Sequence, residues 1–153
     1  MVDIIDLCEY IIYYSNIKDY GISCLKLLKI LYFLQAEWLI TKDTKLFADK
    51  IIAWDIGPVV LRPYKKYIMF GGTDIPRPNE TDKDNFSINK ILQIMSKKDI
   101  KLINDLIDYF KVYSASTLTS ITQHQSPWIE SYSSDKDNEV TCEAIKKYFT
   151  FIL

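Results

Sequence analysis

The stretch that decides the fold is SCLKLLKILYFLQAEWLITK, residues 23–42. Its apolar side chains fall on nearly every side of the helix that the stretch predicts, so we expect other parts of the molecule to surround that helix. The polar residues that interrupt the run indicate surroundings of protein rather than lipid; they are Lys26, Lys29, Gln35 and Glu37. The sequence therefore predicts a central helix over about residues 23–42.

The segments on either side of this stretch also carry helix signals. Most begin at a residue that can cap a helix, and two begin at a proline in a first helical position. Two polar stretches, 76–85 and 133–139, are expected to be exposed loops. The expected helices are 3–17 after Asp3, 58–70 from Pro58, 87–95 after Ser87, one from Ser96 to about Phe110, one from Ser114 or Ser116 to about His124, a brief one at Pro127-Trp128, and one after Thr141.

One short region has the composition of β-structure. Leu46-Phe47 and Ile51-Ile52-Ala53-Trp54 are β-prone stretches separated by polar residues, which predicts a small β-hairpin or extended segment near 46–54. A chain of 153 residues suits one domain, and its hydrophobic fraction of 48% is sufficient for a packed core. We therefore expect a mainly α fold, a compact single-domain helical bundle over residues 1–153 around the helix at about 23–42.

The charge of the chain argues against nucleic acid as a partner. The net charge is −1 at pH 7, so the chain lacks the global basic field that attracts phosphates. Arg62 and Arg77 are its two arginines, although the forked guanidinium is the group that favours guanine and phosphate recognition. Direct reading of nucleic-acid bases is therefore not expected.

The cysteines do not follow the pattern of a disulfide framework or of a zinc site. Cys8, Cys24 and Cys142 are odd in number and far apart, so we expect them to be reduced and buried, with no metal and no cofactor bound. The N-terminus carries the acid Asp3 where a signal peptide carries positive charge. No apolar run reaches the roughly 20 residues of a membrane span. We therefore expect a cytoplasmic protein that does not contact a membrane.

Candidates for catalysis are few. His124 is the sole histidine and so the one candidate for a catalytic base or an imidazole metal ligand. Asp49, Asp55 and Glu37 could supply paired carboxylates, but the sequence does not fix the distance between them, on which acid–base catalysis depends. Neither a glycine-rich phosphate loop nor an HExxH zinc motif is present. We therefore expect a protein that is not an enzyme, with a small hydrolase using Asp55 or His124 as the less favoured alternative.

A basic patch on the predicted helix 58–70 is the candidate surface for a partner. Arg62, Lys65 and Lys66 are three and four residues apart and so share one helix face, with Tyr64 nearby. Such a face is either a plain solvated surface, since exposed charges contribute little to stability, or a docking patch for an acidic partner surface. The eleven tyrosines favour a binding protein, because tyrosine often anchors interfaces.

Three blocks of the sequence resemble the Panacea domain, also called SocA-like and found in phage-associated GepA proteins. The most specific block runs from Leu46 to Tyr64, and the resemblance covers nearly the whole chain. The first block lies at the start of the predicted central helix, and the third lies near the predicted helix that ends at His124. The matching residues are Lys26, Leu27, Lys29, Tyr32, Ala53, Trp54, Gly57, Pro58, Thr122, Pro127 and Trp128.

The resemblance implies a mainly helical antitoxin that neutralises a cognate toxin protein by direct contact. For the SocA branch it also implies an adaptor that delivers the toxin to a Clp-type protease. The family has a histidine directly after the threonine, whereas this chain has Gln123 there and His124 one place later.

The matching residues also have structural roles that need no binding site. Trp54 fills volume, Gly57 permits an unusual turn and Pro58 starts a helix. These residues therefore identify the fold more surely than they identify an interface. The competing function is a regulator that binds DNA, since many antitoxins control their own promoters, and salt-dependent DNA binding would distinguish it.

Overall fold

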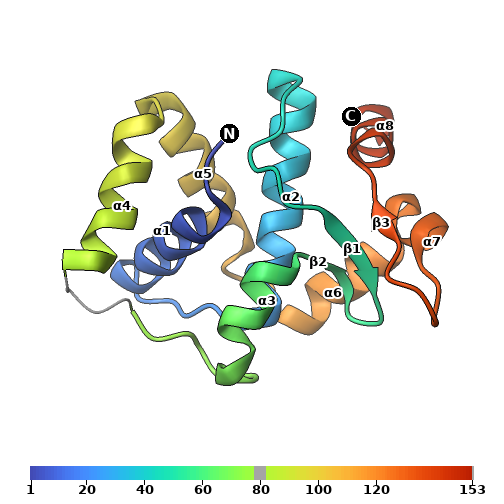
Figure 1. Ribbon diagram of the computed structural model, residues 1–153, viewed down its shortest axis with the longest axis horizontal. Coiled ribbons are helices and arrows are strands. Elements are labelled where there is room, and N and C mark those ends of the chain that lie inside the picture. Colours follow the sequence, from blue (N-terminus) through green and yellow to red (C-terminus); the bar gives the residue numbers. More distant parts are fainter. Residues whose placement is uncertain (78–81, 153) are drawn as a thin grey trace.

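The computed structural model describes residues 1–77 and 82–152 and shows a mainly α fold (Figure 1). Helices surround one central helix, and the described residues form a small antiparallel sheet beside it, with strand order β2-β1-β3. The expected fold class is therefore confirmed. The elements are α1 (Ile4–Ile17), α2 (Cys24–Lys42), β1 (Ile51–Trp54), β2 (Gly57–Val59), α3 (Leu61–Tyr67), the 3₁₀ helix η1 (Ile68–Phe70), α4 (Asp82–Ile94), α5 (Lys97–Phe110), α6 (Ala115–Gln123), α7 (Ser126–Ser131), β3 (Glu139–Val140) and α8 (Cys142–Ile152).

Helix α2 is the centre of the molecule, as its sequence predicts. Ser23 caps it by accepting a hydrogen bond from the Lys26 N–H at 3.3 Å, and the left-handed residue Asp43 ends it at φ 56°. Thirteen of its 19 residues are buried, because α3, α5, α6, α8 and β2 all pack against it. In Figure 1 it stands between α1, α4 and α5 on one side and α6, α7 and α8 on the other.

Helix caps foreseen in the sequence are present at four helix starts. At each one a side-chain oxygen accepts a hydrogen bond from a backbone N–H two or three residues later. These bonds need only neighbours along the chain, which is why the sequence alone predicts them. The acceptors are Asp3 before α1 (2.9 Å), Ser96 before α5 (3.1 Å), Ser114 before α6 (3.1 Å) and Thr141 before α8 (3.1 Å).

The start of α4 differs from the prediction. The helix begins at Asp82, so Ser87 lies inside it instead of capping it, and the predicted loop over 76–85 is wrong from Asp82 onward. Residues 78–81 of that predicted loop lie outside the described residues. Helix α4 packs on α1 and buries Ile88 and Ile91. The side of such a helix that faces solvent can carry polar residues. Polar composition does not by itself separate a loop from the first turn of an amphipathic helix.

The predicted hairpin has the expected strand but a different partner. Strand β1 pairs antiparallel with β2 across the turn Asp55-Ile56, whereas Leu46-Phe47 is not a strand. The Gln35 side-chain oxygen accepts hydrogen bonds from the N–H groups of Leu46 (2.8 Å) and Phe47 (3.3 Å), and its nitrogen donates to the Phe47 carbonyl (2.9 Å). A buried glutamine of α2 thus takes the place of a partner strand.

Strand β1 has a second neighbour that the sequence does not predict. Glu139 and Val140 form β3, at the end of the stretch expected to be an exposed loop, and pair with Ile52 and Ile51. Val140 is buried, as a strand residue facing the core should be. A two-residue strand has no alternating pattern of its own, so only the folded chain reveals it.

Pro58 does not begin a helix, contrary to the prediction. It lies in β2 opposite Ala53, and α3 begins only at Leu61. The Ala53 N–H donates to the Asn138 carbonyl at 2.9 Å and so points away from β2. Ala53 and Pro58 are therefore a pair of opposite residues that exchange no hydrogen bonds, and the pair needs no N–H from proline. Because β2 is an edge strand, proline is compatible with it.

Candidate functional site

A buried lysine of α2 forms a hydrogen bond to the backbone of the hairpin. The side chain of Lys29 has an exposed fraction of 0%, and its ammonium donates a hydrogen bond to the Pro58 carbonyl at 2.8 Å. That carbonyl faces away from β1, so the lysine satisfies an acceptor on the edge of the sheet. Burial removes the hydration of the ammonium and lowers the pKa of Lys29 from 10.5 to about 7.

Gly57 lies at the same point, where α2, α6 and the hairpin meet. Its φ of +91° is in the left-handed region, which favours glycine. A Cβ atom there would lie 2.9 Å from the Thr122 hydroxyl oxygen and 3.0 Å from the Lys29 ammonium. Residues from all three matching blocks of the sequence therefore pack together, a proximity that their spacing along the chain does not reveal.

Two other residues of the first block also make buried or half-buried hydrogen bonds. The Tyr32 hydroxyl donates to the Gln125 side-chain oxygen at 2.7 Å, and its burial raises the pKa of Tyr32. The Lys26 ammonium donates to the Lys111 carbonyl at 3.1 Å, and its partial burial lowers the pKa of Lys26. These bonds tie α2 to the segments that follow α5 and α6.

The turn of the hairpin is held from the other side by α6, α7 and the chain after them. The Trp128 indole N–H donates to the Trp54 carbonyl at 2.8 Å, and the Gln123 amide donates to the Asp55 carbonyl at 2.6 Å. The Trp128 ring stacks on the Tyr132 ring at 4.5 Å, and the Tyr132 hydroxyl donates to the Asp55 carboxylate. Gln123 stands where the resembling family has histidine, and here it fixes the hairpin turn.

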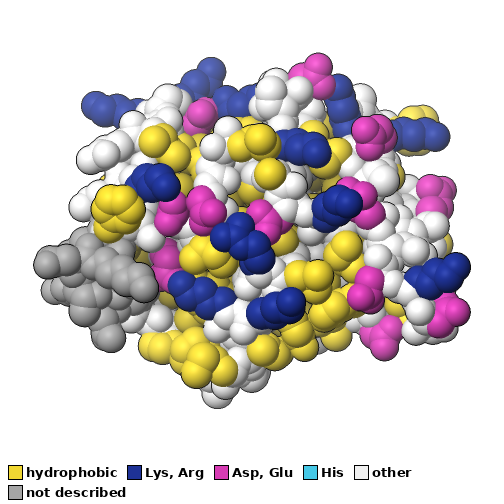
Figure 2. Space-filling view, in the orientation of Figure 1, with side chains coloured by type: hydrophobic (Ala, Val, Ile, Leu, Met, Phe, Trp, Pro, Cys, Tyr) yellow, Lys and Arg dark blue, Asp and Glu magenta, His cyan; other side chains and the backbone are white. Residues whose placement is uncertain are grey.

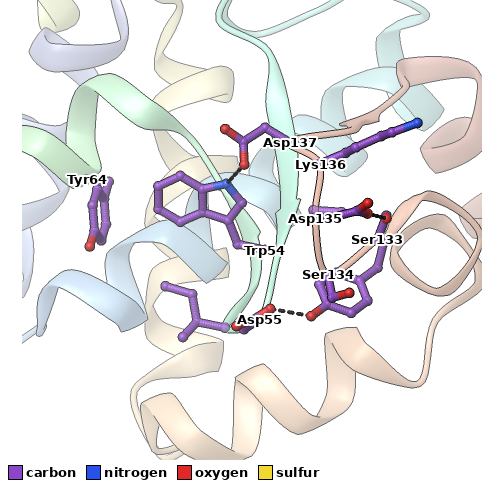
Figure 3. A pocket seen from close by; sticks show the side chains of 11 residues that line it. Trp54, Asp55, Tyr64, Ser133, Ser134, Asp135, Lys136 and Asp137 are labelled. Atoms are coloured by element: carbon purple, nitrogen blue, oxygen red, sulfur yellow. Dashed lines mark hydrogen bonds between the residues drawn. The ribbon is translucent and has the colours of Figure 1, made fainter.

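An open cavity of about 440 Å³ lies between this turn and the segment that follows α7. Figure 3 shows one wall formed by the hairpin and by Tyr64 of α3, and the other formed by residues 132–137. The rings of Trp54 and Tyr64 meet edge to face with centroids 5.0 Å apart. The Trp54 indole N–H donates to the Asp137 carboxylate at 2.9 Å, so it joins the two walls.

The cavity carries more negative than positive charge. Its lining contains the carboxylates of Asp55, Asp135 and Asp137 and the ammonium of Lys136. Each carboxylate accepts a hydrogen bond from a neutral donor: a tyrosine hydroxyl, a serine hydroxyl or an indole. Within the described part of the chain, none of the three forms an ion pair with a lysine or an arginine. The arrangement is therefore suited to a positively charged ligand.

The four residues predicted to bind a partner all lie on helix α3, where two of them form ion pairs within the chain. Arg62 pairs with Asp3 and with Asp49, each at 3.3 Å, and Lys66 pairs with Glu9 at 2.9 Å. Lys65 is exposed, and Tyr64 alone of the four lines the cavity. Figure 2 shows lysine and arginine interspersed with aspartate and glutamate on this face of the molecule.

The residues considered for catalysis lie on different elements of the fold. His124 is exposed at the end of α6, where its Nδ1 lies 2.7 Å from the Ser120 carbonyl of the same helix. Asp55 lies on the cavity, and Asp49 pairs with Arg62. Cys24 is buried in the first turn of α2, and burial raises the pKa of its thiol.

The other two cysteines are also free thiols. Cys8 is buried and Cys142 is half-buried, and burial raises the pKa of both. No group of three or more metal-ligating side chains comes together in residues 1–77 and 82–152. Among these same residues, no helix has both the length and the apolar character needed to cross a membrane.

Comparison with known proteins identifies the family of this chain. No curated protein matches the chain. No solved structure matches it either. In contrast, residues 27–129 match the family described as antitoxin SocA-like, Panacea domain, and this match spans more than half of the chain. It includes most of α2, the hairpin, Tyr64 and Trp128, and it ends before residues 132–137. The chain therefore belongs to the SocA-like antitoxin family with its Panacea domain.

Proposed function

We propose that this chain neutralises a cognate toxin protein by binding it directly, and that binding rather than turnover accounts for its biological effect. The observation that carries the proposal is the family match over residues 27–129, because the family is one of antitoxins. We place the toxin-binding surface around the cavity between the hairpin and residues 132–137. This cavity is open, and the family match supplies the residues of one of its walls.

The hydrogen bonds of the chemically active side chains support binding over catalysis. His124 lies near a carbonyl of its own helix, and the Asp55 carboxylate accepts a hydrogen bond from Tyr132. Lys29 is buried beneath the hairpin with the Pro58 carbonyl as its acceptor. The carboxylates of the cavity would repel the phosphates of a nucleic acid, so they favour a protein partner over DNA.

Titration of the toxin tests this proposal. The toxin is the protein encoded by the neighbouring gene, because antitoxins and toxins are usually encoded together. Residual toxin activity should fall linearly as purified chain is added and reach zero at a fixed molar ratio, with a complex visible by size-exclusion chromatography. Complete inactivation by a small fraction of an equivalent, with no complex, would instead show catalysis.

The His124→Ala variant is the matched control. Its imidazole is exposed and contacts its own helix, so the variant should fold and neutralise the toxin like the parent chain. Loss of neutralisation in this folded variant would contradict the proposal.

The mode of neutralisation can be read from the amount of toxin in cells. Simple inhibition leaves the toxin level unchanged when the antitoxin is co-expressed. The SocA branch suggests a more specific function, delivery of the toxin to a Clp-type protease. Such delivery lowers the toxin level in cells that contain the protease and not in cells that lack it.

A further inference from the structure

The cavity has aromatic walls that suit a cation. Trp54 and Tyr64 stand edge to face at its hairpin wall, with a centroid separation of 5.0 Å and an interplanar angle of 85°. Figure 3 shows the Trp54 ring beside the Asp137 carboxylate, with Tyr64 on the opposite side of that ring. The face of an aromatic ring carries negative charge density and attracts ammonium and guanidinium groups, tryptophan most strongly. The hairpin wall therefore offers aromatic rings that attract a cation.

The carboxylates of the cavity have unused acceptor capacity. Asp137 and Asp135 accept hydrogen bonds from the Trp54 indole and from Ser133, and Asp55 accepts one from Tyr132. An ionised carboxylate has about four lone-pair sites, so each can accept further donors from a ligand. The side chain of Lys136 extends away from Trp54 in Figure 3, so its ammonium does not fill the space beside the ring.

We propose that this cavity receives an arginine side chain of the partner protein. The inference rests on the proposed function, since the partner is the toxin bound there. Arginine fits better than lysine, because its planar guanidinium stacks on aromatic rings and can donate two parallel hydrogen bonds to one carboxylate. The surplus of carboxylates over ammonium groups in the lining supplies the complementary charge.

The two walls have different origins in the sequence. Trp54, Asp55 and Tyr64 lie within the family match, whereas Asp135 and Asp137 lie beyond it. The matched wall supplies the aromatic surface, and the segment after α7 supplies two of the three carboxylates.

The decisive variant is Asp55→Asn/Asp137→Asn. Asparagine keeps an oxygen that accepts from Tyr132 at one site and from Trp54 at the other, so the fold is retained while two charges are removed. The matched control is Asp19→Asn/Asp105→Asn, which removes the same charge from two exposed residues outside the cavity lining. Asparagine also tolerates the positive φ of 62° at residue 19.

Calorimetric titration with the toxin of the neighbouring gene measures the effect. The cavity variant should bind at least about tenfold more weakly with an unchanged melting temperature, because a charge pair across the interface is lost. The control should bind like the parent chain. Equal affinity of the cavity variant and the parent chain would overturn the arginine site while leaving the antitoxin function intact.

A second measurement does not depend on the toxin. In nuclear magnetic resonance spectra, acetyl-glycyl-arginyl-glycine amide should shift the Trp54 indole N–H signal and leave that of buried Trp38 in place. The same peptide with citrulline, which lacks the charge, should have no effect, and nor should the arginine peptide on the cavity variant. If the parent chain forms no complex with the toxin, the proposed function fails, and the absence of a Trp54 shift would then also overturn the arginine site.

Discussion

At the scale of a single residue, the buried ammonium of Lys29 should make the stability of the protein depend on pH. The pKa of Lys29 is lowered from 10.5 to about 7 in the folded chain, so between these values the unfolded chain holds a proton that the folded chain lacks. The free energy of unfolding therefore rises with pH in this window, with a slope approaching about 1.4 kcal/mol per pH unit. Below about pH 7 the lysine is protonated in both states, and the full cost of burying its charge remains.

Replacing Lys29 by methionine, which has a similar length and no charge, should remove this dependence. The difference in unfolding free energy between the parent chain and Lys29→Met should increase in favour of the parent as pH rises from 7 to 10, as measured by urea denaturation. Lys50→Met is the control, because the Lys50 ammonium lies in water in both states. A difference that does not change with pH would show that Lys29 keeps its ordinary pKa.

Two neighbouring lysines of α3 should respond differently to charge reversal. Lys66 pairs with Glu9, whose side chain is only 10% exposed and also accepts a hydrogen bond from the Tyr67 hydroxyl at 2.6 Å. Lys66→Glu therefore places a second carboxylate beside that of Glu9, and the repulsion should lower the free energy of unfolding by about 1–2 kcal/mol. Lys65→Glu, on an exposed residue, should stay within about 0.5 kcal/mol. Equal melting temperatures of the two variants would contradict the role of the Glu9 pair.

At the scale of an element, the hairpin depends on the absence of a side chain at Gly57. A Cβ atom there would meet Lys29 and Thr122 and would also impose strain at φ +91°. Gly57→Ala should therefore lower the free energy of unfolding by about 2–4 kcal/mol in denaturant titrations. Such a loss would report on the fit between the hairpin, α2 and α6.

Two other glycines separate the causes of that loss. Gly71 has φ +58° with nothing within 4 Å of the added Cβ, so Gly71→Ala should show the backbone strain alone, about 1 kcal/mol. Gly72 has neither feature and its alanine variant should be nearly neutral. If Gly57→Ala lowered the free energy of unfolding no more than Gly71→Ala does, the contact of the added Cβ with Lys29 and Thr122 would not affect stability.

At the scale of the whole molecule, we expect residues 1–153 to unfold as one domain. Helix α2 contacts α3 and α5 as well as α6 and α8, and β1 pairs with β3 near the end of the chain. Because both halves bury their apolar surfaces on the same helix, neither should remain folded without the other. Urea unfolding curves from far-UV circular dichroism and from tryptophan fluorescence should superimpose. Separate midpoints would indicate two folding units.

The sequence by itself determines the helical fold and its centre. The apolar run at 23–42 predicts α2, and Asp3, Ser96, Ser114 and Thr141 predict the starts of four helices. Both signals are local, since periodicity and capping involve residues within a few positions of one another. The matching blocks likewise identify the family, although they do not show that Lys29, Gly57 and Thr122 meet beneath the hairpin.

Only the tertiary structure decides the strand partners and the cavity. Leu46-Phe47 is as β-prone as β1, but Gln35 binds its backbone, and β1 instead pairs with β2 and with Glu139–Val140. Pro58 can begin a helix or lie in an edge strand, and the edge position of β2 decides between them. Trp54 and Asp137 are brought together only when β1 and β3 pair, since β-prone residues far apart in sequence do not specify their partners locally.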